Sequence, residues 1–201
     1  MDLVLIAAIG MALAFAFSNG FQDAANAIAT LVASRAARPL PAILMASVAN
    51  LLGPFLLGAA VANTVAGIVT VDPEVAVVVI GAGLTGAVAW NVITWYRGIP
   101  SSASHALVGG LVGAALVAAG LEAVAWGPVV DGHLGGVLGI LVGIFLAAGV
   151  GFDSSWLLER VALRLAGRWS TSAARPVRGA QWGTSAWLAF SHGANDASKA
   201  I

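Results

Sequence analysis

The sequence is poor in cysteine and in charge. None of its 201 residues is a cysteine, which excludes a disulfide framework and thiolate chemistry. Only 9% of the residues are charged, whereas a soluble domain carries about 25%. The formal net charge is zero, which argues against nucleic acid as a partner. Because 60% of the residues are apolar, the composition predicts an integral membrane protein that lies in a lipid bilayer.

A basic region before the first apolar stretch is also missing. The chain begins Met1-Asp2-Leu3, so we expect the first apolar run to be retained and not cleaved as a signal peptide. The apolar runs cover about 3–34, 40–63, 75–95, 101–119 and 133–155, and a last one starts near 180. They are continuous instead of alternating, which favours membrane-spanning helices over a β-barrel. The sequence therefore predicts an all-α membrane protein with several spans.

Basic residues are confined to alternate connections between these runs. Arginines follow the first, third and fifth runs, whereas the charged residues of the other connections are all acidic, such as Asp72 and Glu122. Basic loops remain in the cytoplasm, so we expect a multi-pass protein of the inner (plasma) membrane with its N-terminus outside. The arginine-rich segment 156–179 is predicted to be a cytoplasmic amphipathic piece on the inner leaflet, followed by a linker.

Two stretches of twelve residues share one pattern, 17–28 near the start and 190–201 at the end. They are identical at seven of the twelve aligned positions. The same four places hold polar residues in both copies, namely Asn19, Gln22, Asp23 and Asn26 in the first, and His192, Asn195, Asp196 and Lys199 in the second. On a helix this spacing forms a single stripe. A polar stripe inside an apolar run indicates a functional site.

The loop charges also predict the directions of the two motifs. The first motif helix runs inward, and after five crossings the second motif runs outward, which is typical of an inverted-topology repeat with a substrate site at the midplane. We expect the long first run to break near Ser18-Asn19-Gly20, so that the motif helices are discontinuous. The predicted domains are a first repeat at 1–155, the cytoplasmic segment at 156–179, and a truncated second repeat at 180–201. The chain would then be the N-terminal part of a longer transporter.

The ionisable residues deepest in apolar sequence are Asp23, Asp196 and Lys199. Each costs at least ~2.5 kcal/mol at a helix centre, and such residues usually mark ion or substrate pathways. Mutual neutralisation of Asp196 and Lys199 is an alternative, but it leaves Asp23 and the repeated amides unexplained. We expect five residues to serve a coupling cation: Asn19, Asp23, Asp196, His192 and Lys199. Asp23 and Asp196 would also be the ligands of a metal ion.

A third polar cluster consists of Ser101, Ser102 and Ser104, with His105 directly after them. One serine here is expected to cap a helix, and hydroxyls at a helix N-terminus also form an anion site. A ligand-side and a structural role for His105 both remain open. Moving a dianion inward against 100 mV costs ~4.6 kcal/mol, twice the ~2.3 kcal/mol for one charge. Uptake of an anion therefore needs co-transported cations, which would also shield it from the carboxylates.

At these residues the chain resembles the inorganic phosphate transporter (PiT) family, most closely its bacterial branch. The likeness lies in the two motifs and in the stretch 98–110, which is similar to the family's Pro-Ser-Ser-x-Ser-His element. The resemblance implies symport of inorganic phosphate with H+ or Na+, in bacteria often as a metal–phosphate complex, without enzymatic activity and without a resident cofactor. The candidate phosphate ligands are Ser101, Ser102, Ser104, Gln22, Asn26 and Asn195. Bacterial relatives usually have His where this chain has Gln22.

Other functions are also compatible with these features. A sulfate permease of the same architecture would use the same donors, because hydroxyl and backbone groups suit either tetrahedral oxyanion. A membrane-embedded hydrolase would use Asp23 and Asp196 as a carboxylate pair, and a purely structural subunit would use neither. A homodimer is also compatible with the sequence.

Overall fold

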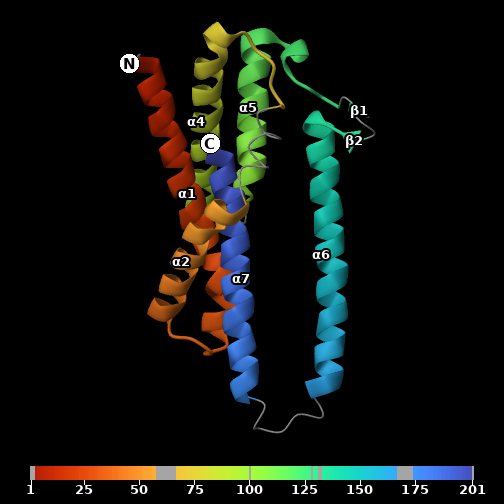
Figure 1. Cartoon of the computed structure of the whole chain (residues 1–201). Helices are drawn as coiled ribbons and strands as arrows, with labels where there is room; N and C mark the ends of the chain where they lie inside the picture. The colour runs from red at the N-terminus through yellow and green to blue at the C-terminus, as the bar shows by residue number, and fades with distance from the viewer. Residues whose placement is uncertain are drawn as a thin grey trace.

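The computed structural model describes residues 3–57, 67–99, 101–127, 129–130, 133–166 and 174–200, and these are helical almost throughout (Figure 1). The helices are α1 (Leu3–Ala33), α2 (Pro39–Leu57), α4 (Pro73–Arg97), α5 (Ala103–Ala119), α6 (Gly136–Ala166) and α7 (Ala174–Ala200). A 3-10 turn, η1 (Leu121–Ala123), and two paired strands of two residues, β1 (Val129–Val130) and β2 (His133–Leu134), connect α5 to α6. The expected all-helical class is confirmed.

In the described part of the chain, three helices are long and apolar enough to cross a membrane, namely α1, α4 and α6. Two shorter helices, α2 and α5, are also apolar. The membrane character predicted from the composition is therefore confirmed. The first and last helices, α1 and α7, run in opposite directions (Figure 1), as an inverted repeat requires. The repeat itself stays a prediction.

The break expected near Ser18-Asn19-Gly20 is absent. Helix α1 continues from Leu3 to Ala33, and α7 likewise passes through the second motif without interruption. The hydroxyl of Ser18 donates to the backbone oxygen of Phe15 at 2.9 Å, so it bonds within its own helix. Gly20 does not have a positive φ, so it continues the helix and does not turn it. The prediction of broken motif helices was wrong for both described motifs.

The segment after residue 155 also differs from expectation. Residues 156–166 are the last turns of α6 and not a separate amphipathic piece. No proline or glycine interrupts the sequence between Phe152 and Ala166, so nothing ends the helix earlier. The guanidinium of Arg160 lies 4.1 Å from the ring centre of Trp156, one turn away. Helix α7 begins at Ala174 instead of near 180. Residues 167–173, within the expected linker, lie outside the described part.

The end of α4 and the start of α5 each have a defined cap. Gly98 ends α4 in the left-handed conformation, with φ of 63°, which glycine adopts without steric cost. The side chain of Ser102 caps the N-terminus of α5 by accepting from the backbone N–H of His105. Between the two helices the backbone of Gly110 lies against the carbonyl of Gly83. The small residues therefore hold α4 and α5 together as a hairpin.

Helix α2 crosses α7 at a second pair of glycines. A Cβ atom at Gly193 would collide with the backbone of Asn50, and one at Gly53 would collide with the backbone of Phe190 and Ala194. The two backbones are therefore in direct contact, which only residues without a side chain permit. Gly193 belongs to the second motif, so the motif glycine has a packing role in α7.

We predict that Gly193→Ala destabilises the intact protein by about 1–3 kcal/mol, because the added methyl group overpacks the α2–α7 crossing. Thermal unfolding in detergent measures this loss as a lowered midpoint. Gly183→Ala is the matched control on the same helix, because Gly183 has nothing within 4 Å of its Cβ position. Equal midpoints for the two variants would contradict the close crossing.

Candidate functional site

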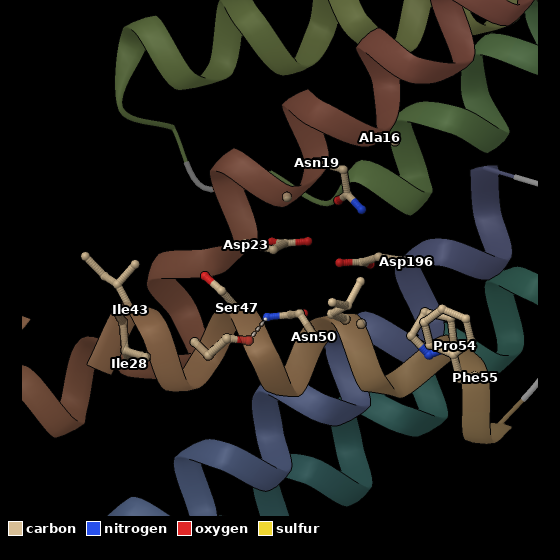
Figure 2. Close-up of a pocket in the computed structure, with 14 residues that line it drawn as sticks. Ala16, Asn19, Asp23, Ile28, Ile43, Ser47, Asn50, Pro54, Phe55 and Asp196 are labelled. Carbon is tan, nitrogen blue, oxygen red and sulfur yellow. Dashed lines mark hydrogen bonds between the residues drawn. The ribbon is translucent and has the colours of Figure 1, made fainter. Parts of the chain in front are cut away.

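A cavity of about 540 Å³ lies between α1, α2 and α7. Its polar lining residues are Asn19 and Asp23 of α1, Ser47 and Asn50 of α2, and Asp196 of α7 (Figure 2). We call it the carboxylate pocket. The rest of its wall is apolar, with residues such as Ile43 and Phe55. The polar residues of both motifs therefore meet at one place, although they are more than 170 positions apart in the sequence.

The two carboxylates of this pocket point toward one another (Figure 2). Asp23 also accepts a hydrogen bond of 3.1 Å from the side-chain amide of Asn26, one turn further along α1. Among the described residues that line the pocket there is no Lys, Arg or His. Two facing carboxylates repel each other unless a cation or a proton lies between them. The arrangement is therefore chemically suited to a cation and unsuited to a bare anion.

Asn19 supplies an independent sign of a ligand. Its side chain is 1% exposed, and its Oδ1 atom has no hydrogen-bond partner among the described residues. Buried amide oxygens are nearly always bonded to protein or water. Since Asn19 lines the pocket beside Asp23, its oxygen is available to a bound cation or to water.

Ser47 and Asn50 of α2 were not among the residues predicted from the sequence. The side-chain nitrogen of Asn50 donates to the backbone oxygen of Ala46 at 2.9 Å, which leaves its Oδ1 free to accept. Figure 2 shows both residues on the side of α2 that faces Asp23 and Asp196. Their spacing of three inside an apolar run is the same signal that marked the motifs. It was overlooked because neither residue is charged.

The first motif does not act as a single stripe. Asn19 and Asp23 face the carboxylate pocket, whereas Gln22 donates its Nε2 to the backbone oxygen of Asn91 on α4. Neighbouring residues on a helix point about 100° apart, so Gln22 and Asp23 face different helices. Asn91 is fully buried and donates to the hydroxyl of Ser18 at 3.1 Å. Gln22 thus ties α1 to α4 at a distance from the carboxylates.

Among the side chains of the second motif that the structure describes, those at 190–196, Asp196 and Gly193 line the pocket. Asn195 is exposed and donates to the backbone oxygen of Ser191 at 3.0 Å. His192 is half-buried, and its Nδ1 atom is buried without a partner among the described residues. The backbone of Lys199 belongs to the last turn of α7, and its side chain lies outside the described part.

The serine cluster lies apart from the carboxylate pocket. None of Ser101, Ser102 and Ser104 is among the residues that line it. Ser101 accepts a hydrogen bond of 2.9 Å from the indole of Trp90, and Ser102 caps α5. Pro100, the first residue of the element, lies outside the described residues. Ser101 and Ser102 therefore have structural contacts, and the predicted anion site stays a prediction.

In the described part of the chain, no group of three or more His, Cys, Asp and Glu residues could hold a metal ion. The proposed metal ligands Asp23 and Asp196 are thus a pair, which would need amide or hydroxyl oxygens to complete a coordination shell.

Comparison with known proteins gives consistent results. Residues 19–175 match the model of the phosphate transporter family. The chain is 39% identical over 198 residues to a "Probable low-affinity inorganic phosphate transporter" of Mycobacterium bovis, and it covers 46% of that protein. A protein with the same name in Bacillus subtilis is 40% identical over the whole chain, which covers 60% of it. The chain thus spans about half the length of the mycobacterial relatives. These names describe transporters, in agreement with the expectation that the chain is not an enzyme.

The fold has a counterpart among solved structures. "The sodium-dependent phosphate transporter" aligns with a TM-score of 0.74 over 99% of this chain and 66% of its own, at 23% identity. At this identity the match supports the arrangement of the helices alone. It carries no information on the ligands of the carboxylate pocket.

Proposed function

Because the chain belongs to the phosphate transporter family, we propose that the intact protein moves inorganic phosphate across the membrane by symport with a cation. The observation that carries the proposal is the carboxylate pocket, in which Asp23 and Asp196 face each other from antiparallel helices (Figures 1 and 2). Facing carboxylates supply oxygen ligands of the kind that hard cations prefer. A coupled cation bound there also offsets the cost of moving an anion.

The cation is proposed to bind at the carboxylates of Asp23 and Asp196 and the free Oδ1 of Asn19. All three are hard oxygen ligands, which suit Na+ and also protons on the carboxylates. His192 precedes Asp196 by one turn and Lys199 follows it by three residues. We propose that both adjust the charge of the pocket during coupling. The solved neighbour is named as sodium-dependent, which supports Na+ as the first ion to test, with H+ second.

Phosphate is proposed to bind at the N-terminus of α5, where Ser101, Ser102 and Ser104 supply hydroxyls. Backbone N–H groups at a helix start favour anions. The amides of Gln22, Asn26 and Asn195 remain candidate ligands in the intact protein. If phosphate is carried as a metal complex, the metal ion would be part of the cargo, and Asp23 and Asp196 would contact it.

Sulfate is the alternative substrate, since it has the same tetrahedral shape. The relatives from Mycobacterium bovis and Bacillus subtilis are named for inorganic phosphate, which supports phosphate. Phosphate, unlike sulfate, gains or loses a proton near neutral pH. Competition of uptake by excess sulfate, measured at two pH values, separates the two substrates.

The charge of the connections supports an orientation in the membrane. We propose that the protein lies in the inner (plasma) membrane with its N-terminus outside, since arginines such as Arg35, Arg97 and Arg160 lie in alternate connections or just before them. The short turn between α1 and α2, which contains Arg35 and Arg38, would then be cytoplasmic.

We predict that Asp23→Asn and Asp196→Asn each abolish cation-driven phosphate accumulation in proteoliposomes that contain the intact protein. Each change removes a charge that the cation requires while keeping the shape of the side chain. Asp153→Asn is the matched control, because Asp153 is exposed on α6, and we expect it to retain uptake. Imposed Na+ and pH gradients in separate experiments identify the coupling ion. Full accumulation in either motif variant would refute the cation assignment.

We also predict that the double variant Ser101→Ala, Ser104→Ala raises the phosphate concentration for half-maximal uptake about tenfold or more. A hydrogen bond to a charged group contributes about 1.5–3 kcal/mol, and one such bond lost is enough for this effect. Ser155→Ala on the exposed face of α6 is the control. Thermal unfolding shows whether the variant still folds. An unchanged half-maximal concentration in a folded variant would place phosphate elsewhere.

A further inference from the structure

The hydroxyl of Ser101 accepts a hydrogen bond and donates none to the residues that the structure describes. The indole Nε1–H of Trp90 on α4 donates to its Oγ at 2.9 Å. An indole can only donate, whereas a serine hydroxyl has one hydrogen to donate and two positions that accept. The bond therefore occupies an acceptor position of Ser101 and leaves its hydrogen for another partner.

The hydroxyl of Ser102 is occupied in the same way. Its Oγ accepts from the backbone N–H of His105 at the N-terminus of α5, so its hydrogen is likewise left to donate. Two neighbouring hydroxyls thus have an acceptor position filled by N–H groups of the protein, one from a side chain of α4 and one from the backbone of α5. Such a pair offers hydrogens to a ligand, and the oxygens of an oxyanion accept them.

We propose that Trp90 is a positioning residue for the bound anion, because its indole N–H makes the Ser101 hydroxyl a donor to a phosphate oxygen. This role rests on the proposed function, in which phosphate binds at the N-terminus of α5. A hydroxyl that already accepts a hydrogen bond is a stronger donor, since bonded groups polarise one another. Its hydrogen also points away from the indole N–H before phosphate arrives, so less freedom is lost on binding.

The backbone beneath Trp90 is held firmly, as a positioning role requires. Thr94 is 1% exposed, and its hydroxyl bonds to the backbone oxygens of Trp90 at 2.9 Å and of Asn91 at 3.1 Å. The backbone oxygen of Asn91 also accepts from the side chain of Gln22 on α1. This part of α4 is therefore bonded to α1 on one side, while the Trp90 side chain reaches Ser101 on the other.

A double-mutant cycle for phosphate uptake by the intact protein in proteoliposomes tests the role of Trp90. Trp90→Phe keeps an aromatic ring and removes the N–H group, and because Trp90 is 52% exposed, the smaller ring leaves no enclosed cavity. We expect the phosphate concentration for half-maximal uptake to rise about three- to tenfold, the effect of one hydrogen bond. The maximal rate and the half-maximal cation concentration should stay unchanged. In protein that already has Ser101→Ala, Trp90→Phe should have no further effect.

Trp126→Phe is the matched control. The Trp126 indole donates to the backbone oxygen of Leu121 at 3.0 Å, in the connection between α5 and α6, so the variant removes an indole bond away from the serines. We expect it to leave the half-maximal phosphate concentration unchanged. Thermal unfolding of each variant in detergent identifies a merely structural bond, because indole N–H groups commonly find a partner for stability alone. A lowered midpoint for Trp90→Phe with an unchanged half-maximal phosphate concentration would overturn the positioning role.

The outcomes for Ser101 separate this role from the proposed function. If Ser101→Ala raises the half-maximal phosphate concentration and Trp90→Phe does not, the role of Trp90 is refuted while phosphate binding at α5 stands. The same holds if the effects of the two changes simply add, because Trp90 would then not act through Ser101. If Ser101→Ala itself has no effect in folded protein, phosphate does not contact this hydroxyl, and both the role of Trp90 and the assignment of Ser101 are overturned.

Discussion

Two negative charges held face to face in apolar surroundings are the constraint on which the rest of this structure depends. Asp23 and Asp196 come from helices that run in opposite directions, and both line one pocket. Ionisable residues inside a membrane usually mark an ion or substrate pathway. A cation bound between these carboxylates, as proposed, would depend on the arrangement of the two helices, which is what coupling requires.

The packing around the pocket follows from the same need. To bring the two carboxylates together, α7 must approach α1 and α2 closely, and Gly53 and Gly193 allow the backbones of α2 and α7 to touch. The side-chain amide of Gln22 donates to the backbone carbonyl of Asn91 and so ties α1 to α4. Helix α4 packs against α5, and the serine cluster lies at the start of α5. A cation at the carboxylates and an anion at the serines would thus be linked through α1.

Much of this arrangement could be predicted from the sequence, because charge inside apolar helices is rare and easily recognised. The membrane class, the helices and the repeated motif all followed from composition and spacing. The contribution of α2 did not, since Ser47 and Asn50 have the spacing of the motif residues but carry no charge. The continuity of α1 was also missed, because a glycine without a positive φ continues a helix and the sequence alone does not reveal φ. Gln22 was assigned to the wrong face because a stripe at spacings of three and four spans a wide angle. The roles of His192 and Lys199, the domain boundaries and a homodimer stay predictions.

The most direct measurement of the central claim is the proximity of positions 23 and 196 in the membrane. None of the 201 residues is a cysteine, so Asp23→Cys with Asp196→Cys introduces a defined pair of thiols into this part of the protein. A short bifunctional thiol reagent should join them within one polypeptide, and the control pair Asp23→Cys with Asp153→Cys should stay unlinked. Absence of the 23–196 link in folded protein, with both thiols reactive to a single-headed reagent, would contradict the shared pocket.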